Sequence, residues 1–579
     1  MELHMDNKLG ALILNSFQKY PERIALETEF SKLTYKELLS EVNEVLRLLI
    51  SKNVTYGSKV IVELKRGPEC IYYILALIKL GAIYIPIDPD HPEIRKSFIK
   101  EDVNAEFIIS KKNSLDEKAI TEIRKAKISH RTGKAAEAGP QLAYILYTSG
   151  TTGKPKGVKI KASAVASLLN WMTKTYGFDT ETRILNKTAL TFDASVWEML
   201  IPFICGGTLC LADPDKDIIP NYLIEMILRF NINTVQFVPA MLRKVLNEPA
   251  FKQCRSLKNV FVGGEILTNE LAKAFFSASK AALHNLYGPT ETTIQVLTHT
   301  VTKADLLNDI PVGRPVSGVQ AYILSQNENE AAVDEIGELC ISGIALAEGY
   351  ISCESEERKR FVFIETLPDS PRVYRTGDLA YRNIVGDIFF CGRLDEQIKI
   401  NGYRVDLNEI EAVLNTHHAV DSVVVSKESN GDLNRLIAFL KCNKTEDALF
   451  EQLTDQIQNT LPHYMWPADY YIVDEIPLTA HAKTDRKTLF EKGKKIKLTQ
   501  RDKPESNKNT KLKKSILHIW QDTLNNKEIG LDSDFYSCGG NSVEAMIIAM
   551  KIREQEGINF SLEEILRFRN VRNIADSIS

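Results

Sequence analysis

The segment Thr148–Gly157, which reads Thr-Ser-Gly-Thr-Thr-Gly-Lys-Pro-Lys-Gly, contains the residue types that bind phosphate, and it follows the apolar run Leu142–Leu146. Glycines let a phosphate approach the backbone, hydroxyls and amides can donate hydrogen bonds to its oxygens, and Lys154 and Lys156 supply positive charge. A Walker A loop does not fit, because Pro155 follows Lys154. A polar turn between a strand and a helix is the alternative, but this density of Ser, Thr, Gly and Lys favours phosphate binding.

Short strands alternate with helical patterns on both sides of this segment. Val60–Leu64 predicts a strand, Glu69–Leu80 has apolar residues at helical spacing, and Ala82–Ile87 predicts a second strand. Such strand–helix–strand units indicate α/β layers with parallel strands. Further strands are predicted at Ala105–Ser110, Thr234–Pro239, Asn259–Val262 and His284–Tyr287, and at Ser422–Ser426, Leu436–Leu440 and Tyr470–Val473 in a smaller α/β stretch.

The length of the chain, 579 residues, is several times the ~100–200 residues of one domain. Composition changes near Gly392–Asp395 and again over Glu491–Lys513, which is rich in Lys, Asn, Gln and Thr and is typical of a solvated linker. Beyond this linker the pattern is only helical. We predict a large multi-layer α/β unit at 1–394, a small mobile α/β unit at 395–492, a linker at 493–511 and an all-α four-helix bundle at 512–579.

Charge and cysteine content argue against several functional classes. Lys+Arg 72 against Asp+Glu 76 gives a net charge of −4, which is not the basic excess of a nucleic-acid binder. The nine cysteines include no CxxC pair, so we expect reduced thiols in a cytosol. The N-terminus lacks the apolar run of a signal peptide, and Ile71–Ile87 is too short and too interrupted to span a bilayer. We therefore expect a cytoplasmic protein without membrane or nucleic-acid partners.

Thr148–Gly157 resembles the phosphate loop of the adenylate-forming enzymes, the superfamily of acyl-CoA ligases, luciferases and nonribosomal peptide synthetase adenylation domains. Other segments resemble further motifs of this family and follow in the family's order, so that the resemblance covers nearly all of residues 10–490. These segments are Leu33–Leu38, Leu80–Pro86, Phe192–Ser195, Asn285–Glu291, Gly337–Leu339, Tyr374–Asp378, Gly392–Asp395, Lys399–Arg404 and Leu461–Met465.

The resemblance implies binding of ATP and Mg²⁺. Tyr287 would stack on adenine, Asn285 would hydrogen-bond the base edge, and Thr290 would touch the α-phosphate. Asp378 would accept both ribose hydroxyls, and Glu291 would be the carboxylate for Mg²⁺, which prefers oxygen ligands. Without the resemblance, Tyr287 would be interpreted as a core tyrosine, and Asp378 and Arg393 would be interpreted as surface charges. The ATP-binding set that the resemblance implies is Thr148, Ser149, Gly150, Thr151, Thr152, Gly153, Lys154, Asn285, Tyr287, Gly288, Thr290, Asp378 and Arg393.

The resemblance implies that Asp193 distinguishes amino-acid activation from fatty-acid or aryl activation. A buried carboxylate is costly without a cation, and in the amino-acid-activating branch the substrate's α-ammonium is that cation. Lys483 takes the place of the family's catalytic lysine, which would neutralise the substrate carboxylate and then the charge developing on the α-phosphate. The family usually has Asn-Gly before this lysine, whereas here His481 and Ala482 precede it, and Ala lacks the positive-φ freedom of Gly.

The segment Asp534–Ser542, Asp-Phe-Tyr-Ser-Cys-Gly-Gly-Asn-Ser, precedes an apolar helical pattern and resembles the attachment site of carrier proteins. The resemblance implies that Ser542 carries 4′-phosphopantetheine, with glycines exposing the serine and helix-end amides favouring the phosphodiester. The alternative is Ser542 as a plain N-cap. The resemblance also implies that the small domain rotates about Asp395 between half-reactions and that Gly402 lets the pantetheine arm pass.

The resemblance also implies which residues line the substrate pocket, by aligning the sequence with the family motif by motif. Gln236 and Gln295 are its only polar side chains besides Asp193 and Lys483, and neutral amides suit a terminal carboxamide, whereas nothing would neutralise a buried carboxylate or cation. The set resembles the pockets of glutamine-activating adenylation domains but differs at Gln295, where those usually have an acid. We expect L-glutamine, or else a polar or aromatic residue of similar length. The predicted lining is Asp193, Ala194, Trp197, Gln236, Phe261, Gly263, Leu286, Ile294 and Gln295, closed by Lys483.

These features predict an amino-acid adenylating ligase fused to a peptidyl carrier domain, acting in nonribosomal peptide synthesis and secondary metabolism. It would form an aminoacyl-adenylate and load the phosphopantetheine thiol as a thioester. Its expected partners are the amino acid, a phosphopantetheinyl transferase, and downstream condensation, reductase or thioesterase modules in trans, unless the chain is a fragment. A stand-alone acyl- or aryl-CoA ligase and a catalytically decayed carrier scaffold remain the alternatives.

Overall fold

The computed structural model describes residues 8–110, 114–115, 141–150, 153–395, 397–400, 402–430, 433–442, 447–477, 484–495, 510–536 and 538–578. The chain divides into two compact units. The first comprises Met1–His91, Lys96–Ser149 and Pro155–Arg404, and the second comprises Pro92–Arg95, Gly150–Lys154 and Val405–Ser579.

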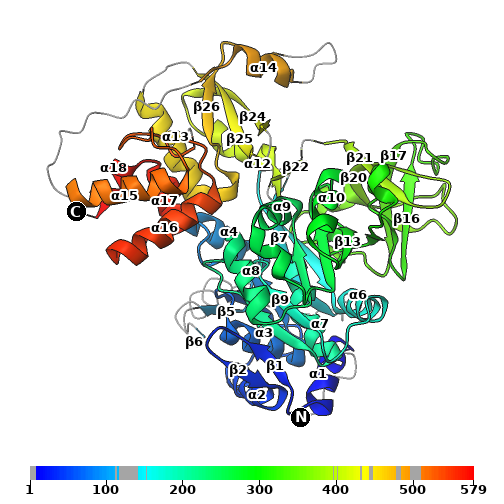
Figure 1. The fold of residues 1–579 in the computed structure, drawn as a ribbon. Helices are drawn as coiled ribbons and strands as arrows, with labels where there is room; N and C mark the ends of the chain where they lie inside the picture. Colours follow the sequence, from blue (N-terminus) through cyan, green and yellow to red (C-terminus); the bar gives the residue numbers. More distant parts are fainter. Residues whose placement is uncertain are drawn as a thin grey trace. The chain divides into compact units, whose positions relative to one another are not determined.

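A nine-stranded sheet runs through the first unit (Figure 1). Its interior strands are parallel, and its edges are antiparallel, as expected where crossovers through helices connect the strands. In spatial order the strands are β15 (Arg314–Pro315), β14 (Leu297–Thr300), β13 (Ala282–Tyr287), β12 (Asn259–Gly263), β11 (Thr234–Phe237), β9 (Arg183–Asn186), β10 (Thr208–Leu211), β1 (Ile24–Glu27) and β2 (Lys32–Thr34).

A second sheet of seven strands also belongs to this unit, and it contains the strand–helix–strand unit that the sequence predicts. The strands β7, β4, β3 and β5 are parallel, whereas β8, β18 and β6 pair antiparallel at its edges. Its spatial order is β18 (Gly349–Tyr350), β8 (Lys156–Lys161), β7 (Leu142–Thr148), β4 (Ile83–Pro86), β3 (Lys59–Glu63), β5 (Phe107–Ser110) and β6 (Ser114–Leu115).

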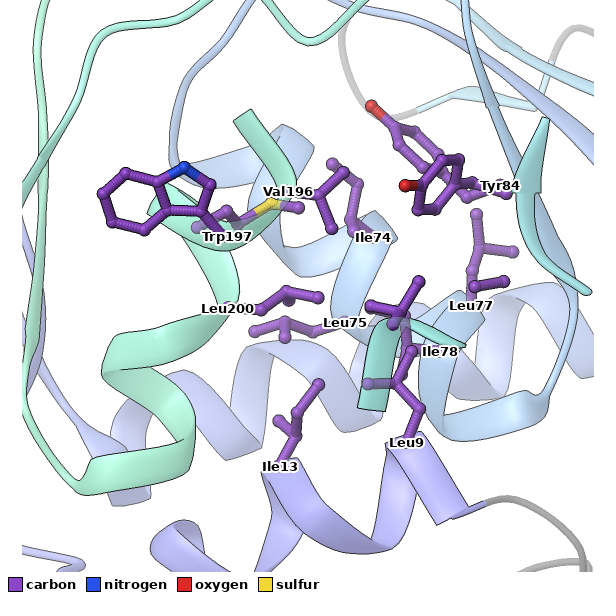
Figure 2. Packing of buried hydrophobic residues seen from close by; sticks show 14 of the residues in the cluster. Leu9, Ile13, Ile74, Leu75, Leu77, Ile78, Tyr84, Val196, Trp197 and Leu200 are labelled. Carbon is purple, nitrogen blue, oxygen red and sulfur yellow. The ribbon is translucent and has the colours of Figure 1, made fainter. Parts of the chain in front are cut away.

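The helix α3 (Pro68–Leu80) is buried on most of its surface, which is typical of a helix enclosed by other elements. Figure 2 shows Ile74 and Ile78 of α3 packed among side chains of α1 (Lys8–Lys19) and α7 (Ala194–Cys205). The other helices of the first unit are α2 (Tyr35–Ser51), most of α4 (Glu93–Val103), α6 (Ala162–Thr175), α8 (Pro220–Arg229), α9 (Pro239–Asn247), α10 (Asn269–Ala278) and α11 (Glu354–Arg360).

An antiparallel sheet follows these two sheets along the chain, and the sequence pattern predicted none of its strands. They are β16 (Val319–Leu324), β17 (Gly337–Gly343), β20 (Arg372–Arg382), β19 (Phe361–Phe363) and β21 (Ile388–Arg393). A separate two-stranded ribbon comes next, formed by β22 (Gln397–Ile400) and β23 (Tyr403–Asp406).

The second unit contains a four-stranded sheet and a helical module. The sheet has the order β24 (Val420–Asn430), β25 (Leu433–Cys442), β26 (Asp469–Ile472) and β27 (Lys494–Lys495), with helices α12 (Leu407–Asn415), α13 (Asp447–Thr460) and α14 (Arg486–Lys492). Four helices form the module, and their core includes Trp520 and Phe535. They are α15 (Thr510–Thr523), α16 (Ser542–Glu556), α17 (Leu562–Phe568) and α18 (Val571–Ser577).

This architecture confirms the predicted fold class, an α/β protein with a C-terminal helical bundle. Within the described ranges, no helix has the length and apolar character needed to cross a membrane. None of the nine cysteines, all of which lie in those ranges, forms a disulfide.

Candidate active site

The candidate phosphate loop connects two paired antiparallel strands, since β7 ends at Thr148 and β8 begins at its partner Lys156. The interpretation as a turn between a strand and a helix is therefore wrong. The Thr148 hydroxyl is buried and has no hydrogen-bond partner among the described residues. Lys156 is buried, and this burial lowers the pKa of its ammonium although Glu291 opposes the shift. An orphaned hydroxyl and a buried cation fit a phosphate, while Thr151 and Thr152 lie outside the described residues.

Tyr287, Asp378 and Arg393 come together although three different strands carry them. The Tyr287 hydroxyl donates to Asp378 Oδ2, and Arg393 pairs with Asp378 Oδ1 across the β20–β21 register. Burial raises the pKa of Tyr287 well above its usual range, so this hydroxyl stays a donor. Asn285 Nδ2 donates to the carbonyl of Pro311 at 2.9 Å. Ribose hydroxyls would therefore have to share Asp378 with Tyr287 and Arg393.

Glu291 is fully buried and both of its oxygens are held by the protein. Oε1 accepts from the Tyr350 hydroxyl at 2.9 Å, and Oε2 pairs with Arg404 Nη1 at 2.7 Å. Burial by itself raises the pKa of the Glu291 carboxyl, but Arg404 and Lys156 outweigh it and lower the pKa to about 2. The sequence assigned no role to Arg404, because it lies 113 positions from Glu291 along the chain.

The described residues contain no group of three or more His, Cys, Asp or Glu side chains that could hold a metal ion. Glu291 nevertheless fits Mg²⁺, because an ionised carboxylate can hold this cation together with substrate phosphates and water. Arg404 would have to release Oε2 for Glu291 to bind the metal with that oxygen.

Asp193 precedes α7 and is held differently. Its Oδ2 accepts from the Thr290 hydroxyl at 2.8 Å, the group that the family resemblance directs toward the α-phosphate. Burial raises the pKa of the Asp193 carboxyl to about 6, against the hydrogen bonds from Thr290 and from the backbone of Ala194. No ion pair of Asp193 is found among the described residues, although the charge of Lys399 acts on this carboxyl at longer range and lowers its pKa, so a ligand ammonium could add a cation in direct contact.

Four of the apolar residues of the predicted substrate pocket, Trp197, Phe261, Leu286 and Ile294, belong to one buried cluster, whereas Ala194 is half-buried. The rings of Trp197 and Phe261 meet edge to face at 5.2 Å, and His284 stacks on Phe261 at 4.8 Å. Burial lowers the pKa of His284 to about 4, so this ring, which the sequence did not single out, is neutral at pH 7.

The polar residues of the predicted pocket are each fixed by one neighbour. Trp197 Nε1 donates to Gln236 Oε1 at 2.6 Å, and Gln295 Nε2 donates to the Sδ atom of Met172 at 2.9 Å. Met172 lies on α6 and was not among the predicted residues.

Gly263 stands opposite Leu286 in the β12–β13 register. A Cβ atom at Gly263 would come within 3.0 Å of the Leu286 carbonyl oxygen, so strand packing by itself favours glycine here.

The predicted hinge residue Asp395 pairs with Arg393 at 2.7 Å and with Arg360 at 3.0 Å. Burial opposes these pairs, but the two arginines lower the pKa of Asp395 to about 2. Gly402 has a φ of +86° and donates its N–H to Glu265 Oε1 at 2.8 Å. A Cβ atom at Gly402 would come within 2.4 Å of Val238 Cγ1, so another residue here would require both a left-handed backbone and a shift of Val238.

Ser542 is the first residue of α16, and Asn541 is the N-cap, with its Oδ1 accepting from the backbone N–H of Val543 at 2.9 Å. The interpretation of Ser542 as a plain N-cap is therefore wrong. Gly540 leaves room for the Phe535 ring, which a Cβ atom there would approach to 2.4 Å. Lys483, His481 and Ala482 lie outside the described residues.

Family profiles cover most of the chain. The AMP-binding enzyme profile matches residues 14–351, the AMP-binding enzyme C-terminal domain matches 409–483, and the phosphopantetheine attachment site matches 514–578. Tyrocidine synthase 3 of Brevibacillus parabrevis is 33% identical over 589 residues, which is 99% of this chain but 9% of that relative. Zwittermicin A synthase ZmaJ of Bacillus cereus is 35% identical over 491 residues, 81% of this chain and 92% of that relative.

Solved structures show the same fold. An artificially fused adenylation–PCP di-domain from Klebsiella oxytoca, NpsA-ThdA, superposes with a TM-score of 0.69 at 25% identity, over 80% of this chain and 93% of that one. Holo-PA1221, an NRPS protein with adenylation and PCP domains, superposes with a TM-score of 0.76 at 24% identity, over 98% and 96% of the two chains. The chain belongs to the AMP-binding, adenylate-forming ligases and has the adenylation and carrier domains of nonribosomal peptide synthetases, which confirms the expected enzyme class and its use of ATP and phosphopantetheine.

Proposed function

We propose that this ligase activates L-glutamine with ATP and transfers the glutaminyl group to the phosphopantetheine thiol on Ser542. The observation that carries the proposal is the pair of buried neutral amides, Gln236 and Gln295, on a predicted pocket that also contains Asp193. Two amides match the hydrogen-bonding needs of a carboxamide. A buried glutamate or lysine side chain would lack a counter-charge there and would be rejected.

Each site residue would have a separate role in the reaction. Asp193 would bind the α-ammonium, while Lys483 would hold the substrate carboxylate in line with the α-phosphorus and then neutralise the charge developing on the phosphate. Tyr287, Asp378 and Arg393 would orient the nucleoside. Mg²⁺ at Glu291 supplies positive charge to the phosphates, and the pantetheine on Ser542 supplies the accepting thiol.

We also propose domain limits at 394/395, 492/493 and 511/512, with Asp395 as the hinge and Gly402 beside the pantetheine arm. The chain spans 9%, 22% and 11% of the length of three of the large synthetases that it matches, so we also propose its partners. They are a phosphopantetheinyl transferase and condensation, reductase or thioesterase modules in trans, in the cytoplasm, without nucleic acid.

Intact-protein mass spectrometry tests the proposal. The holo-protein, incubated with ATP and Mg²⁺, should gain one glutaminyl group from glutamine and much less from glutamate, methionine or leucine. Ser542→Ala should take up neither pantetheine nor amino acid, yet should keep glutamine-dependent pyrophosphate exchange. Modification that persists in Ser542→Ala would place the carrier site elsewhere, and loading by leucine in preference to glutamine would refute the substrate.

A further inference from the structure

We infer that Trp197 and Met172 fix the directions of the two pocket amides, so that Gln236 presents its NH₂ group and Gln295 presents its carbonyl oxygen. The site would then be specific for a terminal primary carboxamide and would discriminate against the corresponding carboxylate. This inference rests on the proposed function, since it needs Gln236 and Gln295 to face the substrate side chain.

The direction of Gln236 follows from the chemistry of the indole. The Trp197 side chain is fully buried. Its Nε1 can only donate, and it lies 2.6 Å from Gln236 Oε1. Turning the amide over would set its NH₂ group against the indole N–H, leaving two buried donors without acceptors. Trp197 follows Val196 on α7 (Figure 2), and its indole is packed edge to face against Phe261 at 5.2 Å within the buried cluster.

The direction of Gln295 follows from the chemistry of the thioether. Met172 Sδ has no hydrogen and can only accept, and Gln295 Nε2 lies 2.9 Å from it. Turning this amide over would set its carbonyl oxygen against the sulfur lone pairs. Met172 is fully buried and Gln295 nearly so, which makes a lost hydrogen bond costly.

One donor group and one acceptor therefore remain. Among the described residues, neither the NH₂ group of Gln236 nor the carbonyl oxygen of Gln295 has a hydrogen-bond partner. A carboxamide satisfies both, because its oxygen accepts from Gln236 and its nitrogen donates to Gln295. A carboxylate has only acceptors, so it would face the Gln295 carbonyl with negative charge, and a thioether or alkyl chain would leave both amides unsatisfied.

The test is the ratio of kcat/KM for glutamine to that for glutamate in pyrophosphate exchange. Met172→Leu keeps the size of the side chain but removes the acceptor, so Gln295 can turn and the ratio should fall about 5- to 10-fold. Met226→Leu is the matched control, because Met226 is an equally buried methionine in a different cluster, and its ratio should equal that of the wild type. Trp197→Phe removes the indole donor and should lower the ratio through Gln236.

The outcomes separate the two proposals. If Met172→Leu and Trp197→Phe slow both substrates equally and keep the wild-type ratio, the inference is overturned while glutamine stands as the substrate. If the wild-type enzyme does not prefer glutamine over glutamate, the proposed substrate and the inference both fail. If one variant does not fold, as a thermal melt would show, the ratio in the other decides.

Discussion

Asp193 and Glu291 are two carboxylates of the first unit that the protein holds in opposite ways. Glu291 meets Tyr350 and Arg404, and its pKa is lowered to about 2. Asp193 meets a hydroxyl and a backbone donor, and burial raises its pKa to about 6. Because a buried charge without a counter-charge is costly, this contrast indicates that Arg404 neutralises Glu291 by direct contact, whereas Asp193 has only the longer-range charge of Lys399 and is left to contact a ligand cation.

Removing the charges one at a time tests this contrast, and Lys483 should have the largest effect. Lys483→Ala should slow glutamine-dependent pyrophosphate exchange by ~10²–10³-fold, since it removes a preorganised charge donor at the developing negative charge. Lys487→Ala, a nearby exposed lysine on α14, is the control and should exchange normally. Near-normal pyrophosphate exchange in Lys483→Ala would contradict the assignment of Lys483 as the catalytic lysine.

Asp193→Asn should come next, with kcat/KM for glutamine reduced about 10²-fold because the charged partner of the ammonium is lost. A des-amino analogue of glutamine, which has no ammonium, should be used no worse by the variant than by the wild type. An equal loss for glutamine and for the analogue would contradict the pairing of Asp193 with an ammonium.

The same substitution should raise stability at neutral pH. A carboxyl whose pKa is raised in the folded state favours folding while protonated, so this contribution of Asp193 is lost as pH rises from 3.8 through about 6. Thermal melts without substrate should therefore show the stability of Asp193→Asn rising relative to that of the wild type between about pH 4 and pH 6 and staying higher at pH 7. A variant that is less stable than the wild type at pH 7 would show that Asp193 is already neutralised.

Arg404→Met should lower the stability of the fold, because it removes the buried ion pair with Glu291. Breaking this buried pair should lower the free energy of unfolding by about 3 kcal/mol, the low end of the usual range, because Lys156 still acts on the carboxylate. The lowered pKa of Glu291 stabilises the fold above pH 4.5, and this contribution disappears as pH falls toward about 2. The variant lacks much of this contribution, so its stability should fall less than that of the wild type on acidification. Arg314→Met, which breaks an exposed pair with Asp387, is the control in urea unfolding, and equal effects of the two would contradict the account.

Gly402→Ala should have the smallest effect on stability, about 1–2 kcal/mol from the left-handed backbone, plus the clash with Val238. Gly386→Ala is the matched control, because Gly386 has a φ of +93° and nothing within 4 Å of an added Cβ. Adding Val238→Ala to Gly402→Ala should recover the difference between the two glycine variants in thermal melts. No recovery would show that Val238 does not limit this position.

Local pattern predicted the parallel layers well, since the strand expected at Val60–Leu64 is β3 (Lys59–Glu63) and the helix expected at Glu69–Leu80 is α3 (Pro68–Leu80). The antiparallel sheet was missed, because its longest strand, β20, mixes buried and half-buried residues with neither a regular alternation nor a simple apolar run. Motif order placed Asp193 and Glu291 in the candidate site. Motifs could not predict Arg404 or Met172, because their partners lie 113 and 123 positions away and only the fold brings them together.

Pyrophosphate exchange by the wild-type protein, measured with each of the twenty amino acids at equal concentration, tests the central claim most directly. We predict that L-glutamine gives the highest rate, well above glutamate, which lacks the carboxamide donor, and above methionine and leucine, which lack both polar groups. A clear preference for a small or branched aliphatic amino acid, or glutamate at the rate of glutamine, would contradict the account.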